Sequence, residues 1–290
     1  MNLHGTGIAL VTPFDREGQV DYEALRRLLQ HTENHVEYWV VHGTTGESVS
    51  TTATEKAQIA EFIRKNNPTQ RTLVYGLGGN NTQHLLEELK KIDFTGYSAI
   101  LSVSPYYNKP SQEGIYQHYV KIADNSPLPI ILYNVPGRTM SNLTAQTTLR
   151  LAEHPNIIGI KEASGNLEQC MNIAHHKPAD FLLISGDDLL TVPMIAVGAS
   201  GVISVLANAF PQKFGDMVRK ALANDFVGAS KLLYNFLAIN ELMYAESNPV
   251  GVKQALELLG VCSSEVRMPL LKATPELKKK ITEKVERMMW

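Results

Sequence analysis

The chain has 290 residues, of which 44% are hydrophobic and 19% are charged. This composition supplies a large buried core and excludes a disordered, collagen-like or disulfide-scaffold protein. The 27 basic and 29 acidic residues leave a formal charge of -2, so no basic field exists to attract nucleic acid or an anionic membrane, and we expect a small-molecule partner.

Cysteine usage and the amino terminus indicate the compartment. Cys170 and Cys262 are far apart and outside any Cys-x-x-Cys spacing, which fits a reducing environment. Residues 1–7 lack the basic and apolar regions of a signal peptide, so we predict a cytoplasmic protein. The uncharged stretch 189–212 is long enough to cross a bilayer, but its Pro, Gly, Ser and Asn residues predict a helix, a turn and a buried strand instead.

Short apolar runs rich in Ile, Val and Leu recur along the chain, each followed by turn-forming residues. Their spacing is close to the roughly 30 residues of a strand–helix–strand unit. The eight runs cover residues 8–11, 38–41, 72–75, 99–103, 129–133, 157–161, 182–185 and 201–205. They predict eight buried strands.

Helical signals lie between these runs. Asp21 precedes leucines at helical spacing, and Thr52 with Glu55 forms a capping box before an apolar face. Near-continuous apolar strands that alternate with helices predict a parallel sheet covered by helices. Eight such units match a closed (β/α)8 TIM barrel better than an open sheet, which remains the alternative.

After about residue 223 the strand signals stop. Residues 226–244 are strongly apolar, and Thr274-Pro275-Glu276 begins a last helix with Leu277, Ile281, Val285 and Met288 on one face. We predict a barrel domain over residues 1–224 that carries the active site, and a C-terminal helical domain over residues 225–290. The helical part packs either under the barrel or against a neighbouring subunit.

Lys161 ends the sixth predicted strand, at the carboxyl end where barrels of this class carry their active sites. Period-two alternation places it on the same strand face as Ile157 and Gly159. If this face is the barrel interior, burial disfavours the ammonium form and leaves a free amine that can form a Schiff base with a ketone. A lysine that only extends to solvent at the strand end fits the spacing as well.

Tyr133 ends the preceding run and is followed by Asn134-Val135-Pro136-Gly137-Arg138. A buried tyrosine hydroxyl beside the amine could transfer protons, and Arg138 offers a planar fork for a carboxylate. A core tyrosine bonded to the backbone and a surface arginine are the alternatives.

The turn Gly43-Thr44-Thr45-Gly46-Glu47 supplies hydroxyls and backbone amides that suit a small carboxylate. It lacks the Gly-Lys-Ser/Thr ending of a phosphate-binding loop. Asp187 and Asp188 are interpreted as caps of the following helix, and no metal site is expected.

These residues together resemble the pyruvate-dependent class I aldolases of the dihydrodipicolinate synthase and N-acetylneuraminate lyase superfamily, along nearly the whole chain. The motifs that carry the resemblance to the dihydrodipicolinate synthase branch are Tyr106-Tyr107-Asn108-Lys109-Pro110, Tyr133-Asn134-Val135-Pro136-Gly137-Arg138-Thr139, Lys161-Glu162-Ala163-Ser164-Gly165-Asn166, Ser185-Gly186-Asp187-Asp188, Gly201-Val202-Ile203-Ser204 and Asn248-Pro249.

The resemblance implies a role for each matched residue. Lys161 forms the imine with pyruvate, and Thr45 with the Ile203 backbone holds the pyruvate carboxylate and its imine. Thr44, Tyr133 and Tyr107 form a proton relay, with Tyr107 reaching in from a neighbouring subunit of a homotetramer. Arg138 binds the carboxylate of L-aspartate 4-semialdehyde, and Gly186 is a further substrate-binding position.

The implied reaction is the condensation of pyruvate with L-aspartate 4-semialdehyde to 4-hydroxy-tetrahydrodipicolinate, a step of diaminopimelate and lysine biosynthesis, without metal or cofactor. The alternatives are a lyase of the same superfamily that acts on sialic acid or a keto-deoxy-sugar acid, and a non-catalytic barrel that binds a small ligand. Arg138 favours the condensation, because a sugar-acid site needs hydroxyl-binding groups at that position.

Two departures from the resemblance concern regulation and local polarity. His42 directly precedes the threonine turn, where the family more often has a small or apolar residue. Lysine-sensitive relatives bind the effector with a glutamate and histidines; here Asn80 and Tyr106 match, but His84 stands in the glutamate position and Lys56 replaces a histidine. Because a cation facing a cationic effector is unfavourable, we expect weak or absent lysine inhibition.

Overall fold

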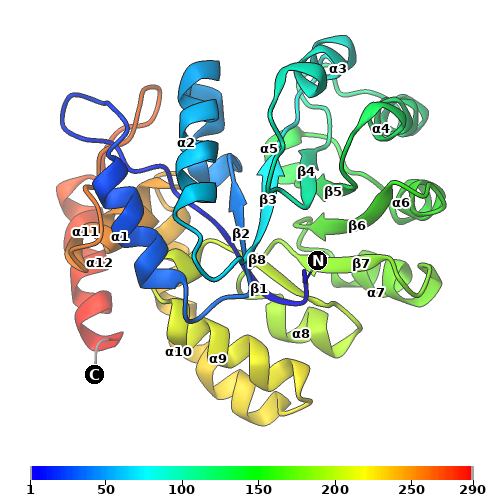
Figure 1. Ribbon diagram of the computed structural model, residues 1–290. Helices are drawn as coiled ribbons and strands as arrows, with labels where there is room; N and C mark the ends of the chain where they lie inside the picture. Colours follow the sequence, from blue (N-terminus) through cyan, green and yellow to red (C-terminus); the bar gives the residue numbers. More distant parts are fainter. Residues whose placement is uncertain (1, 289–290) are drawn as a thin grey trace.

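Eight parallel strands close into a barrel in the order in which they occur along the chain, with helices between them (Figure 1). The computed structural model describes residues 2–288. The strands are β1 (Gly5–Ala9), β2 (Tyr38–Val41), β3 (Thr72–Gly76), β4 (Ala99–Val103), β5 (Ile130–Asn134), β6 (Ile157–Glu162), β7 (Leu182–Ser185) and β8 (Gly201–Ser204). The predicted (β/α)8 fold is confirmed, and the open-sheet alternative is wrong.

The first strand differs from its prediction, because it begins at Gly5 rather than Ile8. Gly5 pairs with Gly201 of β8, and a Cβ atom at Gly201 would lie 2.0 Å from the Gly5 carbonyl oxygen. Glycine in a sequence usually indicates a turn. Here Gly5 and Gly201 instead permit the close approach of two strand backbones.

The helices that cover the barrel are α1 (Tyr22–Thr32), α2 (Ala53–Lys65), α3 (Thr82–Lys91), α4 (Gln112–Asn125), α5 (Pro136–Thr139), α6 (Ala145–Ala152), α7 (Leu167–His176), α8 (Thr191–Ala196) and α9 (Pro211–Leu222). Both predicted helix starts are confirmed. The Asp21 carboxylate accepts from the Ala24 amide, and Thr52 and Glu55 form the reciprocal capping box. Each cap satisfies amide groups that a helix start leaves without partners.

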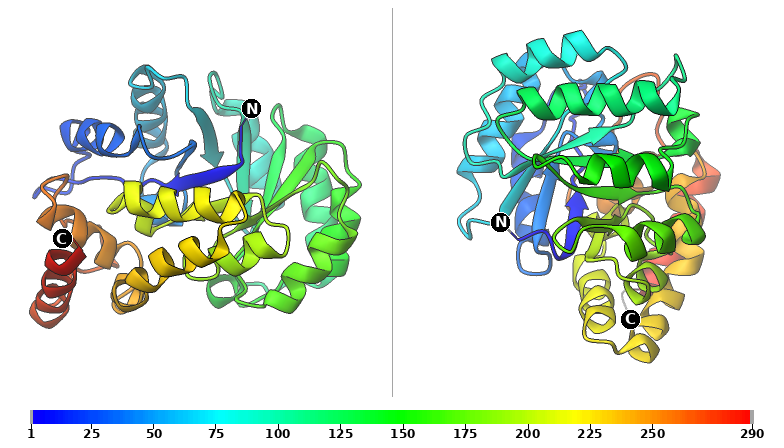
Figure 2. Two further views of the ribbon diagram at one scale, coloured as in Figure 1. Left: turned by 90° about the horizontal axis from the view of Figure 1, so that it is seen from below. Right: turned by 90° about the vertical axis from the view of Figure 1, so that its right-hand side faces the viewer.

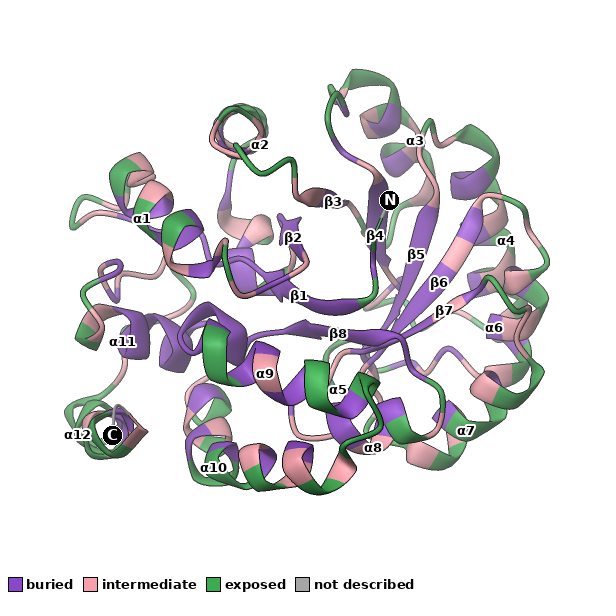
Figure 3. Ribbon diagram, turned by 60° about the horizontal axis from the view of Figure 1, so that its bottom comes forward, coloured by how far each residue is buried: buried purple, intermediate pink, exposed green. Residues whose placement is uncertain are grey.

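Two apolar layers hold the barrel together. Inward-facing strand residues, among them Val40, Val74, Ile131 and Ile184, form one buried cluster, and outward-facing residues pack with the helices in a second, larger one. Figure 3 shows the resulting arrangement, with buried strands inside helices whose outer faces are exposed. The closed inner layer fixes the position of each side chain at the carboxyl ends of the strands.

Three further helices follow the barrel: α10 (Phe226–Tyr244), α11 (Val250–Leu258) and α12 (Pro275–Met288). They pack on one another, and α10 also packs on α8 and α9. Figure 2 shows α11 and α12, in orange and red, on the side of the molecule away from α4 and α6. Leu277, Ile281 and Val285 are buried, which confirms the predicted apolar face of the last helix. The division into two domains at residue 224 stays a prediction.

The apolar stretch 189–212 is divided as predicted. It forms α8, the turn before Gly201, and β8. Within residues 2–288 the structure contains no helix with the length and apolar character needed to span a bilayer.

Candidate active site

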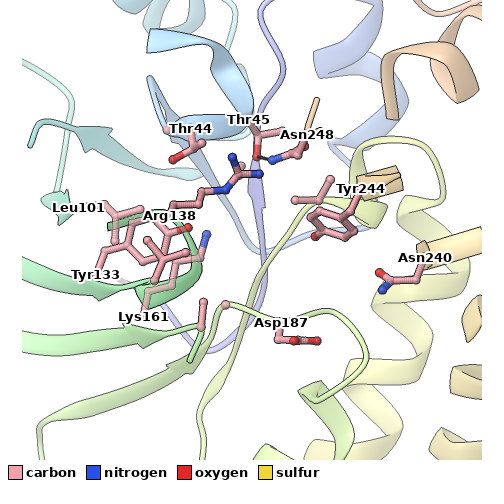
Figure 4. Close-up of a pocket in the computed structure, with 16 residues that line it drawn as sticks. Thr44, Thr45, Leu101, Tyr133, Arg138, Lys161, Asp187, Asn240, Tyr244 and Asn248 are labelled. Atoms are coloured by element: carbon pink, nitrogen blue, oxygen red, sulfur yellow. Dashed lines mark hydrogen bonds between the residues drawn. The ribbon is translucent and has the colours of Figure 1, made fainter. Parts of the chain in front are cut away.

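A cavity of about 250 Å³ lies at the carboxyl ends of the strands (Figure 4). It brings together most of the site residues predicted from the sequence. Its lining includes Thr44, Thr45, Tyr133, Arg138, Lys161, Gly186, Asp187, Asn240, Tyr244 and Asn248. The first five come from three separate parts of the barrel, and the last three come from α10 and the segment after it.

Lys161 lies on the inner face of β6, where its side chain is only 5% exposed. It pairs in register with Tyr133 of β5, and Gly159 pairs with Ile131. The expectation that Ile157 shares this face is wrong. The β5–β6 register shifts between Ile130 and Ile131, so Ile157 turns to the outer cluster while Gly159 and Lys161 stay inside.

The surroundings of Lys161 favour its neutral form. Burial lowers the pKa of the amine to about 8, the Arg138 guanidinium also lowers it, and the Asp188 carboxylate opposes the shift. The amine Nζ atom lies 4.5 Å from the centroid of the Tyr133 ring. A lysine in this position carries a substantial free-amine fraction near neutral pH and is therefore a nucleophile.

Asp188 is a buried acid close to this amine, and its interpretation as a helix cap is wrong. Its Oδ2 atom accepts from the amides of Val205 (3.2 Å) and Leu206 (2.8 Å), beyond β8, while Oδ1 has no partner. Burial raises the pKa of Asp188 to about 6. The neighbouring Asp187 does not cap the helix either, because its Oδ1 atom accepts from the Leu189 and Leu190 amides in the turn before α8 (Thr191–Ala196), which has no side-chain cap.

Tyr133 is the last residue but one of β5, and its buried ring faces Lys161. Burial raises the pKa of its hydroxyl, whereas Arg138 and a hydrogen bond with Thr44 act in the opposite direction. The strand end below it is held by a buried network in which the Asn134 amide donates to both carboxylate oxygens of Glu162, at 3.1 and 3.0 Å. The two strands that carry Tyr133 and Lys161 are therefore also joined by side chains.

The threonine turn follows β2 as a single turn of 3-10 helix, Thr44–Gly46. Thr45 is buried, and its Oγ1 atom accepts from the Asn248 amide nitrogen at 3.0 Å. Thr44 is exposed towards the cavity. The Thr12 hydroxyl donates to the Gly46 carbonyl oxygen at 2.7 Å, which holds the turn against β1.

Three other predicted residues take different positions around the pocket. Arg138 lies on α5 at the exposed mouth. Gly186 follows β7, where a Cβ atom would lie 2.7 Å from Ala163 and 3.0 Å from Lys161 Cε, so only glycine leaves the amine its space. Ile203 is buried on β8 within the inner cluster, and its side chain does not line the pocket.

Tyr107 does not join the pocket of its own chain. Its side chain is 87% exposed, and its backbone has a φ of 68°, in the left-handed region. Tyr106 and Lys56 instead line an adjoining cavity of about 530 Å³, which shares Thr44, Tyr133 and Arg138 with the pocket. Asn80 and His84 are exposed near the start of α3 and lie outside this lining.

His42 is buried beside the threonine turn and also has a left-handed backbone, with a φ of 61°. Its Nε2 atom is 3.0 Å from the Lys56 carbonyl oxygen, which can only accept, so Nε2 carries the proton. Burial lowers the pKa of His42 to about 3. His42, which differs from the small or apolar residue that the resemblance leads one to expect, is therefore neutral and has a structural role.

Asn240, Tyr244 and Asn248 were not predicted as pocket residues. Figure 4 shows Asn240, Tyr244 and Asp187 on the side of the pocket away from Tyr133 and Thr44. No local pattern in the apolar stretch 226–244 distinguishes a side chain that faces a pocket from one that faces the core; only the packing of α10 on the barrel does. Within residues 2–288 no group of three or more His, Cys, Asp and Glu side chains is arranged to hold a metal ion.

Comparison with known proteins agrees with the resemblance found in the motifs. Residues 2–288 match the model of the dihydrodipicolinate synthetase family. A 4-hydroxy-tetrahydrodipicolinate synthase of Cytophaga hutchinsonii is 50% identical over 282 residues, which cover 97% of this chain and 95% of the relative.

Solved structures give the same result. The dihydrodipicolinate synthase of Aquifex aeolicus has a TM-score of 0.94 at 37% identity, covering 99% of this chain and 98% of that one. The chloride-inhibited dihydrodipicolinate synthase of Acinetobacter baumannii, complexed with pyruvate, has a TM-score of 0.95 at 35% identity, covering 98% of both chains. The chain therefore belongs to the dihydrodipicolinate synthetase family.

Proposed function

We propose that this protein condenses pyruvate with L-aspartate 4-semialdehyde to form 4-hydroxy-tetrahydrodipicolinate, through an imine on Lys161. The family and the name of the Cytophaga relative support this reaction, and the Acinetobacter complex supports pyruvate as a substrate. The observation that carries the proposal is the buried Lys161 amine, with its pKa lowered to about 8, beside Tyr133.

Imine formation begins when the free amine of Lys161 attacks the ketone carbon of pyruvate and water leaves. Thr45 and the backbone at Ile203 hold the pyruvate carboxylate and the imine. The protonated imine then acts as an electron sink, so the pyruvate methyl group loses a proton and becomes an enamine. Burial of the site favours this sequence, because it increases the fraction of Lys161 that is present as the free amine.

Proton transfer in these steps is assigned to Tyr133 and Thr44. Both residues line the pocket, Thr44 acts to lower the pKa of the Tyr133 hydroxyl, and Tyr133 faces the amine that gains and loses protons. Groups positioned in this way typically contribute about 10² to 10⁴ in rate.

The second half of the reaction forms the carbon–carbon bond. The enamine carbon attacks the aldehyde, and the amine of the aldehyde substrate then displaces Lys161 by transimination, which closes the ring and releases the product. Arg138, at the mouth of the pocket, binds the carboxylate of the semialdehyde in this scheme.

A condensation assay separates this reaction from that of a sugar-acid lyase. The purified protein is supplied with pyruvate and either L-aspartate 4-semialdehyde or N-acetylmannosamine, and consumption of pyruvate is followed. We expect turnover with the semialdehyde alone. Turnover with N-acetylmannosamine alone would contradict the proposal.

Assembly into a homotetramer, a dimer of dimers, is part of the same proposal. Tyr107 is exposed and lies outside the pocket lining of its own chain, as expected for a residue that completes the relay of a neighbouring subunit. Mixing two inactive variants tests this idea. In a hybrid of Lys161→Ala and Tyr107→Phe subunits, the site of the Tyr107→Phe subunit keeps its own Lys161 and receives Tyr107 from its neighbour. We therefore expect activity to return on mixing. No recovery despite hybrid formation would contradict this assembly.

A further inference from the structure

The threonine turn ends at a buried ion pair that joins it to the C-terminal helices. The Glu47 carboxylate accepts from the Lys253 amine at 2.5 Å, and both side chains are almost wholly inaccessible, at 2% and 0% exposure. The other carboxylate oxygen accepts from the Arg267 backbone amide at 2.9 Å. Glu47 has a φ of 51°, in the left-handed region that non-glycine residues rarely adopt.

Buried ion pairs are costly to form. Removing two charges from water carries a desolvation penalty that the attraction between them often fails to exceed, so apolar residues of similar volume are commonly as stable. The pair is nevertheless strongly held here: Lys253 also donates to the Glu265 carbonyl oxygen at 2.7 Å and lies 4.3 Å from the Phe14 ring centroid. Stability alone therefore does not explain why two charges occupy this place.

The contacts of the C-terminal segment converge on the turn. Asn248 donates to the Thr45 hydroxyl, Lys253 donates to the Glu47 carboxylate, and the Arg267 amide donates to the same carboxylate. A nearby ion pair, between Arg267 and Glu55, involves α2 rather than the turn. Residues 248–267 thus hold the turn at Thr45, in its middle, and at Glu47, its last residue, while Thr12 holds Gly46 between them.

We propose that Glu47 and Lys253 are positioning residues, which fix the turn so that Thr45 meets the pyruvate carboxylate and Thr44 meets Tyr133. The inference rests on the proposed function for the identity of the ligand. It predicts that disturbing the pair weakens pyruvate capture while the aldehyde-binding Arg138, which lies on α5, is unaffected.

Two variants disturb the pair in different ways. Glu47→Asp keeps the charge but shortens the side chain by one methylene, so the turn must move to keep its partners. The double variant Glu47→Gln/Lys253→Met removes both charges at similar volume and leaves no unpaired buried ion. The matched control is Val285→Ala, which opens a cavity on the buried face of α12, away from the pocket, and so lowers stability without touching the turn.

The readout is the pyruvate dependence of borohydride trapping, followed by intact mass, on protein that is folded by circular dichroism. A purely structural defect lowers the amount of adduct but leaves the half-saturating pyruvate concentration unchanged. We expect both Glu47 variants to raise that concentration by about tenfold or more. The reason is that misplacing a group in an active site by about 1 Å can cost about 100-fold in activity. Val285→Ala should keep the wild-type value.

Wild-type half-saturation in whichever variant folds would overturn the inference, and failure of both variants to fold would reduce the pair to a structural role. Absence of any adduct in the wild-type protein would instead contradict the proposed function. In steady state, the same displacement raises the KM for pyruvate but not the KM for the semialdehyde.

Discussion

The Lys161 amine lies 4.5 Å from the centroid of the Tyr133 ring, and the two residues pair in register on neighbouring strands. The parallel register carries both side chains to the same level of the barrel interior. Because Gly186 leaves space beside the lysine, the amine has a free approach from the cavity. In the proposed reaction, this pairing brings the Lys161 amine and the Tyr133 ring to the same end of the substrate.

The pH dependence of pyruvate capture follows from the lowered pKa of Lys161. With that pKa at about 8, kcat/KM for pyruvate should rise about tenfold per pH unit below 8 and level off above it. Asp188→Asn removes a negative charge that favours the ammonium form, so it should move the profile to lower pH. An unchanged or upward-shifted profile in this variant would contradict the assignment.

Loss of the Tyr133 hydroxyl should affect turnover rather than folding. We expect Tyr133→Phe to lower kcat by about 10² to 10⁴, with a thermal midpoint close to that of the wild type. Tyr38→Phe is the matched control, because the Tyr38 hydroxyl donates to the Val202 carbonyl oxygen inside the barrel at 3.1 Å, outside the pocket lining. Equal losses of kcat in both variants would show that any buried hydroxyl matters and would remove Tyr133 from the relay.

The residues found from sequence are those with a local signal. Lys161, Tyr133 and the threonine turn each follow a strand, and parallel strands bring their carboxyl ends to one edge. Lys253 was missed and Asp188 was misinterpreted as a helix cap because their partners are not local: Lys253 is 206 residues from Glu47, and Asp188 is 17 and 18 residues from Val205 and Leu206. Alternation also failed at Ile157, where a register shift between strands, not visible in one strand's sequence, breaks the period of two.

Acid stability should depend on His42. Its pKa is about 3 in the folded protein and 6.5 in the unfolded chain, so below pH 6.5 the unfolded state binds the extra proton. The contribution of neutral His42 to the free energy of unfolding is complete above pH 6.5. It is lost as the pH falls towards 3, at about 1.4 kcal/mol per pH unit.

Urea titrations between pH 7 and pH 4 measure this contribution against His42→Asn, since asparagine tolerates the left-handed backbone. The free energy of unfolding of the wild type minus that of the variant should decrease as the pH is lowered. Taking this difference also removes the effect of other titrating groups, such as His118, that both proteins share. A difference that is constant with pH would contradict a neutral, buried His42.

Lysine should inhibit weakly or not at all. Lys56 lines the cavity that adjoins the pocket, and His84 stands exposed near the start of α3, where lysine-sensitive relatives carry a glutamate. The Lys56 ammonium repels a cationic effector, and a carboxylate that would attract it is absent at position 84. Titration of the purified enzyme with lysine checks this expectation, and strong inhibition at submillimolar lysine would show that other groups bind the effector.

The most direct measurement is reduction with borohydride in the presence of pyruvate, followed by peptide mass analysis. We predict one pyruvate adduct, on Lys161, and none in folded Lys161→Ala. Lys253 is an internal comparison, because this buried amine is paired with Glu47 and should not react. An adduct on any other lysine, or no adduct at all, would contradict the account.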